Sequence, residues 1–377
     1  MKKALIAVNY IGFVYFLWDD IDLLKEMGYQ VYLAADSAKE ESHTLTLLEE
    51  RGVTFVDVPL DSKSPLTGKN LDAFNIYRKL LAREKFNLIH CHTPIVGLFL
   101  RMAARRYRRK GAKVLYTTHG LAYTHLSSRK EYLIYHTIES FASRFCDAII
   151  TINREDYDNA RKLHCKKIFH VNGMGVDTAR YREVEIDRQE YRAKLGIPVD
   201  KIMVLSVGEL SVRKNHTVIV EAISRLKNKD AYVYAICGHE MTAGGTTQAI
   251  RDLSLRLGVE VVFLGFRRDI PEVIHCSDIG AIPSVREGLG LAGIESLSAG
   301  VPLVGSDVQG IKEYIVEGKT GFLCSPFDAE GFAKGIEALS DEKTRLSMKA
   351  ACQEIVQKFD ASVSVVQRRE IYSEILR

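Results

Sequence analysis

The chain has 377 residues, of which 46% are hydrophobic and 27% charged, and its formal net charge at pH 7 is +4. This size and composition are typical of a globular protein with two domains. The sequence contains no run of about 18 apolar residues, so no membrane-spanning helix is expected. The charge is too small to imply a nucleic-acid partner, and seven scattered cysteines without a C-x-x-C pair argue against both a disulfide framework and a zinc site.

The first half of the chain alternates short apolar runs with amphipathic segments. Its opening, MKKALIAVNY, has no small-residue cleavage site after the apolar stretch, so it predicts a β-strand rather than a signal peptide. Strands are expected at 4–8, 31–35, 54–58, 87–91, 113–118, 148–152 and 167–171, and helices at 18–27, 42–50, 71–84 and 129–145. Strands that are apolar throughout and are separated by helices indicate a parallel α/β sheet.

The alternation of apolar runs and amphipathic segments stops at the polar segment 176–200 and resumes after it. Further strands are expected at 202–208, 232–238, 259–265, 278–284 and 302–306. The two series predict an α/β fold with two doubly wound, Rossmann-like domains, at 1–180 and 181–355, and a C-terminal helix at 356–377 that packs back on the first domain. Ligands of such sheets bind beyond the carboxyl ends of the strands, so two facing sheets would form a binding cleft.

The most informative segment is PSVREGLGLAGIESLSAGVPLVGSD, residues 283–307. Gly288 and Gly290 leave the backbone bare where a ligand could approach, and a helix that begins near Leu291 would direct free N–H groups at an anion. Glu287 precedes this helix and Glu295 lies within it, where a carboxylate suits the paired hydroxyls of a ribose. The alternative is that Glu287 caps the helix and Glu295 is a solvated surface charge.

This segment resembles the E-x7-E motif of glycosyltransferase family four, a group of retaining enzymes with the GT-B fold, and the resemblance covers essentially the whole chain. The segments REGLGLAGIE and VGELSVRKNH are most similar to the branch that builds bacterial capsular polysaccharides and exopolysaccharides. The resemblance implies two Rossmann-like domains that face a cleft, a nucleotide-diphosphate sugar donor, here a UDP-sugar, and a saccharide or lipid-linked saccharide acceptor. It places Glu287 by the transferred sugar, Glu295 on the ribose, and sugar hydroxyls and phosphate on the amides of Gly288, Leu289, Gly290 and Leu291.

A second segment, LSVGELSVRKNH at 205–216, follows the first strand of the second domain. Lys214 and Arg213 stand where a loop could reach a diphosphate, and a cation there would stabilise the charge that grows on the leaving group. The alternative is a solvated loop. The family usually has an arginine where this chain has Glu209, so either Arg213 substitutes for that arginine or Lys214 acts alone.

Other candidate residues also follow predicted strands. His119, in LYTTHGLAY, could hydrogen-bond the donor sugar or stabilise charge near the anomeric carbon, and the family often has a histidine at this place; a structural or surface role is the alternative. His90 and His92, in LIHCHTP, could serve the acceptor side or support a loop. In the family, a glycine-rich turn corresponding to Gly12 approaches the diphosphate.

The segment GFRRDI, residues 265–270, follows the strand VEVVFL. The resemblance implies that Phe266 and Arg267 hold the nucleotide base. An ordinary turn, in which Asp269 caps a helix that begins near Pro271, is compatible with that role.

The basic run RMAARRYRRKGAK, residues 101–113, places Arg101, Arg105, and Arg108 or Arg109 at helical spacings. Such a helix could dock on an anionic membrane surface, and a solvated helix face is the alternative. The resemblance to the family favours membrane docking over a solvated helix face, because polymer-building members often use lipid-linked acceptors. We therefore expect a cytoplasmic protein that docks peripherally on the inner face of the plasma membrane.

These expectations combine into one mechanism. His119, Glu287 and Lys214 are the predicted catalytic residues, and no cofactor or metal is expected, because lysine and the helix N-terminus supply the positive charge. Two other functions stay open: a nucleotide-sugar epimerase built on the same scaffold, and a non-catalytic partner that binds nucleotide-sugar or membrane.

Overall fold

The computed structural model of the chain describes residues 1–38, 42–62, 64, 67–240 and 245–377. These residues form two compact units. Unit 1 contains Met1–Met174 and Ser362–Arg377, and unit 2 contains Gly175–Ala361. The backbone thus leaves unit 1 after Met174 and returns after Ala361, whereas the sequence suggested divisions near residues 180 and 355.

Unit 1 is built on a seven-stranded sheet in the order β3-β2-β1-β4-β5-β6-β7, and every neighbouring pair of strands is parallel. The strands are β1 (Lys2–Tyr10), β2 (Tyr29–Asp36), β3 (Thr54–Asp57), β4 (Leu88–His92), β5 (Lys113–Thr118), β6 (Ala148–Thr151) and β7 (Lys167–His170). The predicted strands of the first half are confirmed, with ends that shift by a few residues. Strand order reverses between β1 and β4, which is the place where doubly wound sheets bind ligands.

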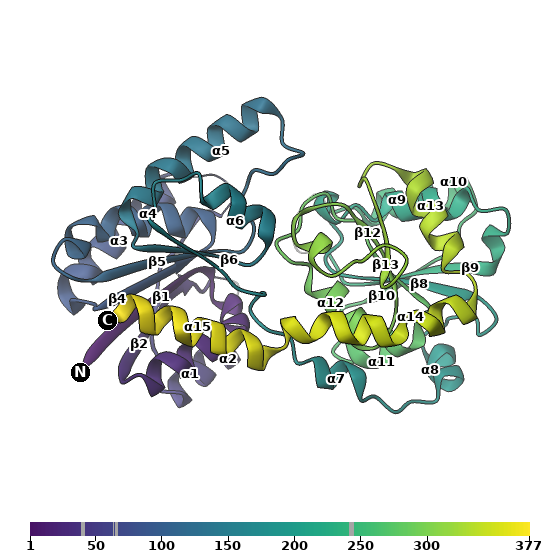
Figure 1. Cartoon of the computed structure of the whole chain (residues 1–377), viewed down its shortest axis with the longest axis horizontal. Helices are drawn as coiled ribbons and strands as arrows, with labels where there is room; N and C mark the ends of the chain where they lie inside the picture. Colours follow the sequence, from purple (N-terminus) through teal and green to yellow (C-terminus); the bar gives the residue numbers. More distant parts are fainter. Residues whose placement is uncertain (39–41, 63, 65–66, 241–244) are drawn as a thin grey trace. The chain divides into compact units, whose positions relative to one another are not determined.

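Helices cover both faces of this sheet (Figure 1). They are α1 (Trp18–Glu26), α2 (Ser42–Glu50), α3 (Gly68–Glu84), α4 (Pro94–Arg108), α5 (Arg129–Ala142), α6 (Arg154–Ala160) and the last helix, α15 (Ala361–Leu376). Helices α3, α4 and α5 lie on one face, and α1 and α15 lie on the other (Figure 1). The apolar core between the sheet and α3–α4 includes fully buried Leu5, Tyr77 and Leu100.

The C-terminal helix α15 is fastened to unit 1 by buried polar groups. Arg368 lies 3.2 Å from a carboxylate oxygen of Asp19 and 3.2 Å from one of Asp20. The hydroxyl of Tyr372 donates a hydrogen bond of 2.9 Å to Asp20. Burial raises the pKa of Asp20, and the Arg368 charge and the Tyr372 bond oppose that shift. A buried carboxylate of this kind needs such partners, so α15 completes the unit.

Unit 2 has a six-stranded sheet in the order β10-β9-β8-β11-β12-β13, again with parallel neighbours. Its strands are β8 (Ile202–Val207), β9 (Tyr232–Cys237), β10 (Val261–Gly265), β11 (Ile279–Ile282), β12 (Leu303–Ser306) and β13 (Gly321–Cys324). The sequence predicted all of these except β13. Strand order reverses between β8 and β11.

The helices of unit 2 also lie on both faces of its sheet (Figure 1). They are α7 (Thr178–Arg182), α8 (Arg188–Lys194), α9 (Thr217–Ser224), α10 (Thr247–Leu257), α11 (Ile270–Cys276), α12 (Leu291–Ser298), α13 (Ala329–Ala338) and α14 (Glu342–Ile355). Two of them lie in the polar segment 176–200, which the sequence suggested was a link. Arg188 and Arg192 of α8 each lie 2.6 Å from a carboxylate oxygen of Asp278, so this segment is part of unit 2.

Two expectations from composition can be compared directly with the structure. All seven cysteines are free thiols, and all but Cys324 are buried. Within the described residues, no helix is both long enough and apolar enough to span a bilayer.

Candidate active site

The site in unit 2 is built on the two loops that follow β8 and β11, the strands at which the sheet order reverses. Backbone and side-chain bonds tie these loops together. The N–H of Val285 donates to the carbonyl of Arg213 at 2.9 Å, and the side-chain amide of Asn215 donates to the carbonyl of Pro283 at 3.1 Å. Asn215 has a left-handed backbone (φ +55°), which ends the short helical turn that carries the two cations. Residues far apart in sequence are thereby held in one place.

Glu287 lies at the centre of this site. Its Oε2 atom accepts hydrogen bonds from Nη1 of Arg213 at 2.9 Å and from Nζ of Lys214 at 3.2 Å. The Glu287 side chain is only 13% exposed. Burial alone would raise the pKa of this carboxyl, but the charges of Lys214 and Arg213 more than offset burial and lower it. Glu287 is therefore an anion at neutral pH, held between two cations.

Glu209, the residue that departs from the family pattern, belongs to the same cluster. Its Oε1 atom accepts from the hydroxyl of Ser211 at 2.8 Å and from Nη2 of Arg213 at 3.3 Å. Arg213 thus bridges two carboxylates, Glu209 and Glu287, whereas the ion pair of Lys214 is with Glu287. The two cations are not equivalent, because only Arg213 is partly neutralised by a second carboxylate.

Helix α12 begins at Leu291, as predicted. Its N-cap is Gly290, which has a left-handed backbone (φ +76°), and no side chain caps the helix. The alternative that Glu287 is the cap is therefore wrong. A Cβ atom on Gly290 would lie 2.8 Å from the hydroxyl of Tyr314, so glycine is required for both backbone shape and space. The N–H of Gly293 donates to the carbonyl of Gly290 at 2.9 Å, so within the described residues the N–H groups of Leu291 and Ala292 are the ones that this helix start offers to an anion.

Glu295 lies in the second turn of α12 and is half-buried. Burial raises its pKa, while a hydrogen bond with Tyr181 and the charges of Arg180 and Lys214 pull the pKa down. The alternative that Glu295 is a freely solvated surface charge does not fit this environment. Tyr181, on α7, was not identified from the sequence.

A mainly apolar pocket of about 310 Å³ adjoins the cluster and includes both residues that were predicted to hold the base. Its lining comprises Val207, Gly208, Glu209, Cys237, Gly238, His239, Phe266, Arg267 and Ile270. The exposed ring of Phe266 meets the ring of His239 edge-on, with centroids 5.8 Å apart. Glu209 is shared by this pocket and the cation cluster, so a nucleotide could occupy both.

Asp269 is the N-cap residue of α11, as the ordinary-turn interpretation had it, but its side chain makes no capping hydrogen bond within the described residues. The carboxylate instead accepts hydrogen bonds from Arg267, with Nε to Oδ1 at 2.9 Å, and from the hydroxyl of Tyr191. Arg267 and Tyr191 lower the pKa of Asp269 to about 2. Arg267 is thereby fixed at the edge of the pocket.

In unit 1, His119 follows β5 and Gly12 follows β1. Gly12 is half-buried and lies in a short 3-10 helix, Ile11–Phe16, rather than in an open turn. The ring of Phe13 packs edge-on against His119 at a centroid distance of 4.8 Å. Burial and the charge of Arg368 lower the pKa of His119 to about 4, so its imidazole is neutral at pH 7.

Unit 2 brings together most of the predicted donor-binding residues, and a further element supports them. The side-chain oxygen of Gln309 accepts from the N–H of Glu287 at 3.2 Å. A Cβ atom on Gly310 would lie 2.3 Å from the carbonyl of Gly288 and 2.4 Å from Cα of Leu289. This segment packs directly against the backbone of Gly288 and Leu289, although its sequence carries no signal that marks it. Within the described residues, no group of three or more His, Cys, Asp or Glu side chains is arranged so that it could hold a metal ion.

The predicted membrane arginines do not share one surface, and the prediction for Arg101 is wrong. Its side chain is fully buried and lies 2.8 Å from Glu139 on α5. Its guanidinium also stacks over Tyr116, 4.0 Å from the ring centroid. Arg108 is partly engaged, with Nε 2.9 Å from Asp147. Of the four predicted membrane arginines, only Arg105 and Arg109 are exposed.

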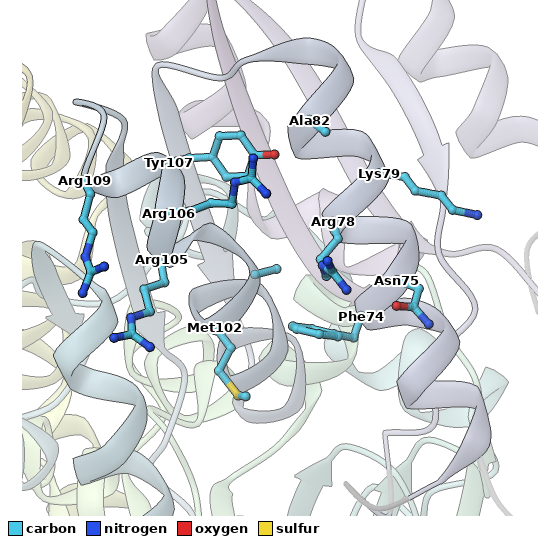
Figure 2. A pocket seen from close by; sticks show the side chains of 11 residues that line it. Phe74, Asn75, Arg78, Lys79, Ala82, Met102, Arg105, Arg106, Tyr107 and Arg109 are labelled. Atoms are coloured by element: carbon cyan, nitrogen blue, oxygen red, sulfur yellow. The ribbon is translucent and has the colours of Figure 1, made fainter.

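Arg105 and Arg109 line an open pocket of about 810 Å³ formed by α3 and α4 and the residues just after α4. Three further cations, Arg78, Lys79 and Arg106, line it with them, together with the aromatic rings of Phe74 and Tyr107 (Figure 2). The described lining contains five cations and no carboxylate. The basic surface is therefore shared between two helices.

Comparison with known proteins identifies the family. The model of glycosyl transferases group 1 matches residues 187–355, and the model of Glycosyltransferase Family 4 matches residues 16–180. EpsD of Bacillus subtilis (strain 168), which bears a glycosyltransferase name, is 32% identical over 95% of this chain and 91% of its own length. An Escherichia coli enzyme, UDP-Gal:alpha-D-GlcNAc-diphosphoundecaprenol alpha-1,3-galactosyltransferase, is 26% identical over 89% of this chain and 88% of its own.

Solved structures agree on the fold. Anabaena HepE, in complex with UDP and glucose, matches 99% of this chain and all of its own with a TM-score of 0.79 at 20% identity. WaaG, a glycosyltransferase involved in lipopolysaccharide biosynthesis, matches 98% of this chain and 99% of its own with a TM-score of 0.73 at 16% identity. The predicted GT-B fold is confirmed. With two family models on its two halves and a full-length relative above 30% identity, the chain belongs to glycosyltransferase family 4.

Proposed function

We propose that the protein is a retaining glycosyltransferase that moves a hexosyl or N-acetylhexosaminyl group from a UDP-sugar to a saccharide or lipid-linked saccharide, in the synthesis of a bacterial polysaccharide. One observation carries this proposal. Glu287 is held by Lys214 and Arg213 beside the uncapped start of α12, at the point where strand order reverses. Two cations and free N–H groups suit a diphosphate, and an adjacent carboxylate suits sugar hydroxyls.

In this proposal the donor lies along unit 2. The base enters the 310 Å³ pocket beside Phe266 and Arg267, Glu295 accepts from the ribose hydroxyls, and the diphosphate meets Lys214, Arg213 and the start of α12. The names of the relatives support uridine: the E. coli relative uses UDP-Gal, and HepE was solved with UDP and with UDP-glucose.

Transfer requires the C1–O bond to the diphosphate to break while the acceptor oxygen bonds to C1. The acceptor hydroxyl attacks from the face that UDP leaves, so configuration is retained, and its proton passes to the departing phosphate oxygen. Lys214 and Arg213 stabilise the negative charge that develops on that diphosphate, which lowers the barrier because this charge is larger in the transition state than in the bound donor. The Glu287 anion orients the sugar, and the neutral imidazole of His119 is the second group proposed to do so.

The donor can be tested by calorimetry with UDP, ADP and GDP, followed by transfer assays with UDP-sugars. We expect UDP to bind more tightly than ADP or GDP, and to raise the melting temperature because it binds only the folded state. Tight binding of ADP without binding of UDP would contradict the proposed donor. Conversion of a UDP-sugar to its epimer without any acceptor would indicate an epimerase instead.

We propose further that unit 1 docks on anionic membranes through the basic pocket of α3 and α4 (Figure 2). Five clustered cations should attract anionic headgroups, each by about 1 kcal/mol near the surface. The lipid-linked acceptor of the E. coli relative supports this location, since an enzyme at the bilayer meets such an acceptor more often than one in solution.

The docking surface can be tested by co-sedimentation with vesicles that contain phosphatidylglycerol. The double variant Arg105→Gln/Arg109→Gln should lose most binding at low salt and keep its affinity for UDP. The double variant Arg251→Gln/Arg256→Gln, which removes two exposed arginines from α10 in unit 2, is the matched control and should bind vesicles as the wild type does. Wild-type protein that stays in the supernatant at low salt would show that the pocket is only a solvated surface.

A further inference from the structure

Three histidine rings form a row in unit 1. His90 and His92 are alternate residues on one face of β4, which ends at His92, and His119 follows β5. The ring centroids of His90 and His92 are 4.2 Å apart, and those of His92 and His119 are 5.2 Å apart in a stacked arrangement. His90 and His92 are fully buried, so neither can contact an acceptor. The suggestion from the sequence that they serve the acceptor side is therefore wrong. Only His119 is partly exposed.

All three rings are neutral at pH 7. Burial, followed by the neighbouring imidazoles and Arg368, lowers the pKa of His90 to about 3 and the pKa of His92 well below its ordinary value. The pKa of His119 is about 4. Each neutral ring carries a single N–H, on either Nδ1 or Nε2, so each has one donor and one acceptor. The hydrogen bonds decide which nitrogen holds the proton.

For His90 the assignment follows from Tyr372. The hydroxyl of Tyr372 donates its proton to Asp20, so it can only accept from Nδ1 of His90, 2.8 Å away. His90 therefore carries its proton on Nδ1. Its Nε2 atom accepts from the hydroxyl of Thr117 at 2.7 Å. Both ring nitrogens of His90 are satisfied.

For His92 the two ring nitrogens differ. Nδ1 of His92 lies 2.9 Å from Nε2 of His119, whereas Nε2 of His92 is buried and has no hydrogen-bond partner among the described residues. If His119 donated to His92, the proton of His92 would sit on Nε2 as an orphaned buried N–H, which is rarer and more costly than an unpaired acceptor. If His92 donates from Nδ1, its buried Nε2 is only an unused lone pair. The second arrangement is favoured.

We infer that His92 is a positioning residue that donates from Nδ1 to Nε2 of His119 and so holds His119 in the tautomer with its proton on Nδ1. Nε2 of His119 is then occupied, and Nδ1–H is a donor of fixed direction. Within the described part of the chain, Nδ1 of His119 has no hydrogen-bond partner. A fixed N–H suits an oxygen acceptor, such as a sugar hydroxyl or a phosphate oxygen. The identity of that oxygen rests on the proposed function, whereas the tautomer does not.

The tautomer can be read directly by NMR of protein with ¹⁵N-labelled histidine, because protonated and unprotonated ring nitrogens differ widely in chemical shift. We expect His119 of the wild type to be protonated on Nδ1. His92→Phe keeps an aromatic ring but cannot donate, so His119 should populate both tautomers. His92→Asn places an amide N–H close to the position of Nδ1 and should restore the wild-type signal. Exposed His164→Phe is the control that should change nothing.

Kinetics supply the second readout. His92→Phe should lower kcat/KM with a UDP-sugar by roughly ten- to a hundredfold, the scale of losing a neighbour that orients a functional group. The Kd of UDP should stay unchanged if the acceptor oxygen belongs to a sugar hydroxyl and should rise if it belongs to a phosphate. His92→Asn should recover most of that loss. A wild-type His119 protonated on Nε2 would overturn the inference, even if His92→Phe failed to fold. A correct tautomer in a protein that transfers no sugar would instead refute the proposed function alone.

Discussion

Lys214 offers the sharpest test of where the diphosphate lies. Its Nζ atom is 3.2 Å from Glu287, and its side chain is only 16% exposed, so the ammonium is held in place with little water around it. We expect Lys214→Ala to lower kcat/KM by about a hundredfold or more, the scale of losing one preorganised charged donor. A hundredfold loss corresponds to about 2.7 kcal/mol of transition-state stabilisation.

Arg213 provides the internal comparison. Its side chain is 37% exposed, and its guanidinium is divided between Glu209 at 3.3 Å and Glu287 at 2.9 Å. Because one carboxylate already offsets its charge and water screens it more, Arg213→Ala should cost about tenfold, less than Lys214→Ala. Equal losses would mean that Arg213 fully replaces the family's usual arginine in a two-cation clamp.

The effect of Lys214→Ala should be on catalysis rather than folding. Glu287 keeps its bond to Arg213 in this variant, so no buried carboxylate is left without a partner. We therefore expect the free energy of unfolding to change by about 1 kcal/mol or less. Lys214→Arg should retain part of the activity, and the exposed Lys227→Ala is a matched control with wild-type kinetics.

The assay is release of UDP over a range of donor concentrations, together with calorimetry of UDP binding and urea unfolding of each variant. Loss of turnover in a folded Lys214→Ala protein supports the placement. Near-normal turnover in that variant would show that the diphosphate lies elsewhere in unit 2.

Three further predictions concern the metal, the sugar loop and pH. Full activity should survive exhaustive EDTA treatment, and activity that is lost and then restored by a divalent cation would contradict the assignment of charge stabilisation to Lys214. Gly310→Ala should weaken UDP-sugar binding at least tenfold, because its Cβ would lie 2.3 Å from the carbonyl of Gly288 and displace that loop; an unchanged Kd would refute this. Burial lowers the pKa of His90 to about 3 and of His216 to about 4, so the unfolded chain binds protons that the folded one does not below pH 6.5. Resistance to urea should therefore fall between pH 6.5 and 4, by up to about 1.4 kcal/mol per pH unit for each such histidine, and a flat profile would contradict it.

The sequence predicted the fold well because the strands of parallel sheets are continuous apolar runs. It missed β13, Gly321–Cys324, because four residues that begin with glycine carry little periodic signal. The segment 176–200 looked like a link since its charges are abundant, yet Arg192 in that segment pairs with Asp278, 86 residues later. Such long-range ion pairs leave no local pattern.

The candidate site shows the same contrast between features that depend on local sequence and features that depend on long-range contacts. The position of Glu287 before a helix that begins at Leu291 could be predicted, because both lie in one local motif. The burial of Arg101 could not, since helical spacing gives the periodicity of a face but not what covers that face. Its partner, Glu139, comes from another helix, 38 residues along the chain. The contribution of Arg78 on α3 to the basic pocket was missed for the same reason.

The return of the chain to unit 1 has a consequence for biosynthesis. Unit 2 is continuous from Gly175 to Ala361, so it can fold as soon as that stretch has emerged from the ribosome. Unit 1 begins earlier but needs Arg368 and Tyr372 of α15 to neutralise and cover Asp20. Unit 1 is therefore synthesised first but completed last. Until α15 has been synthesised, the carboxylate of Asp20 lacks these two partners and stays hydrated. A premature stop that removes only α15 should spare unit 2 and destabilise unit 1.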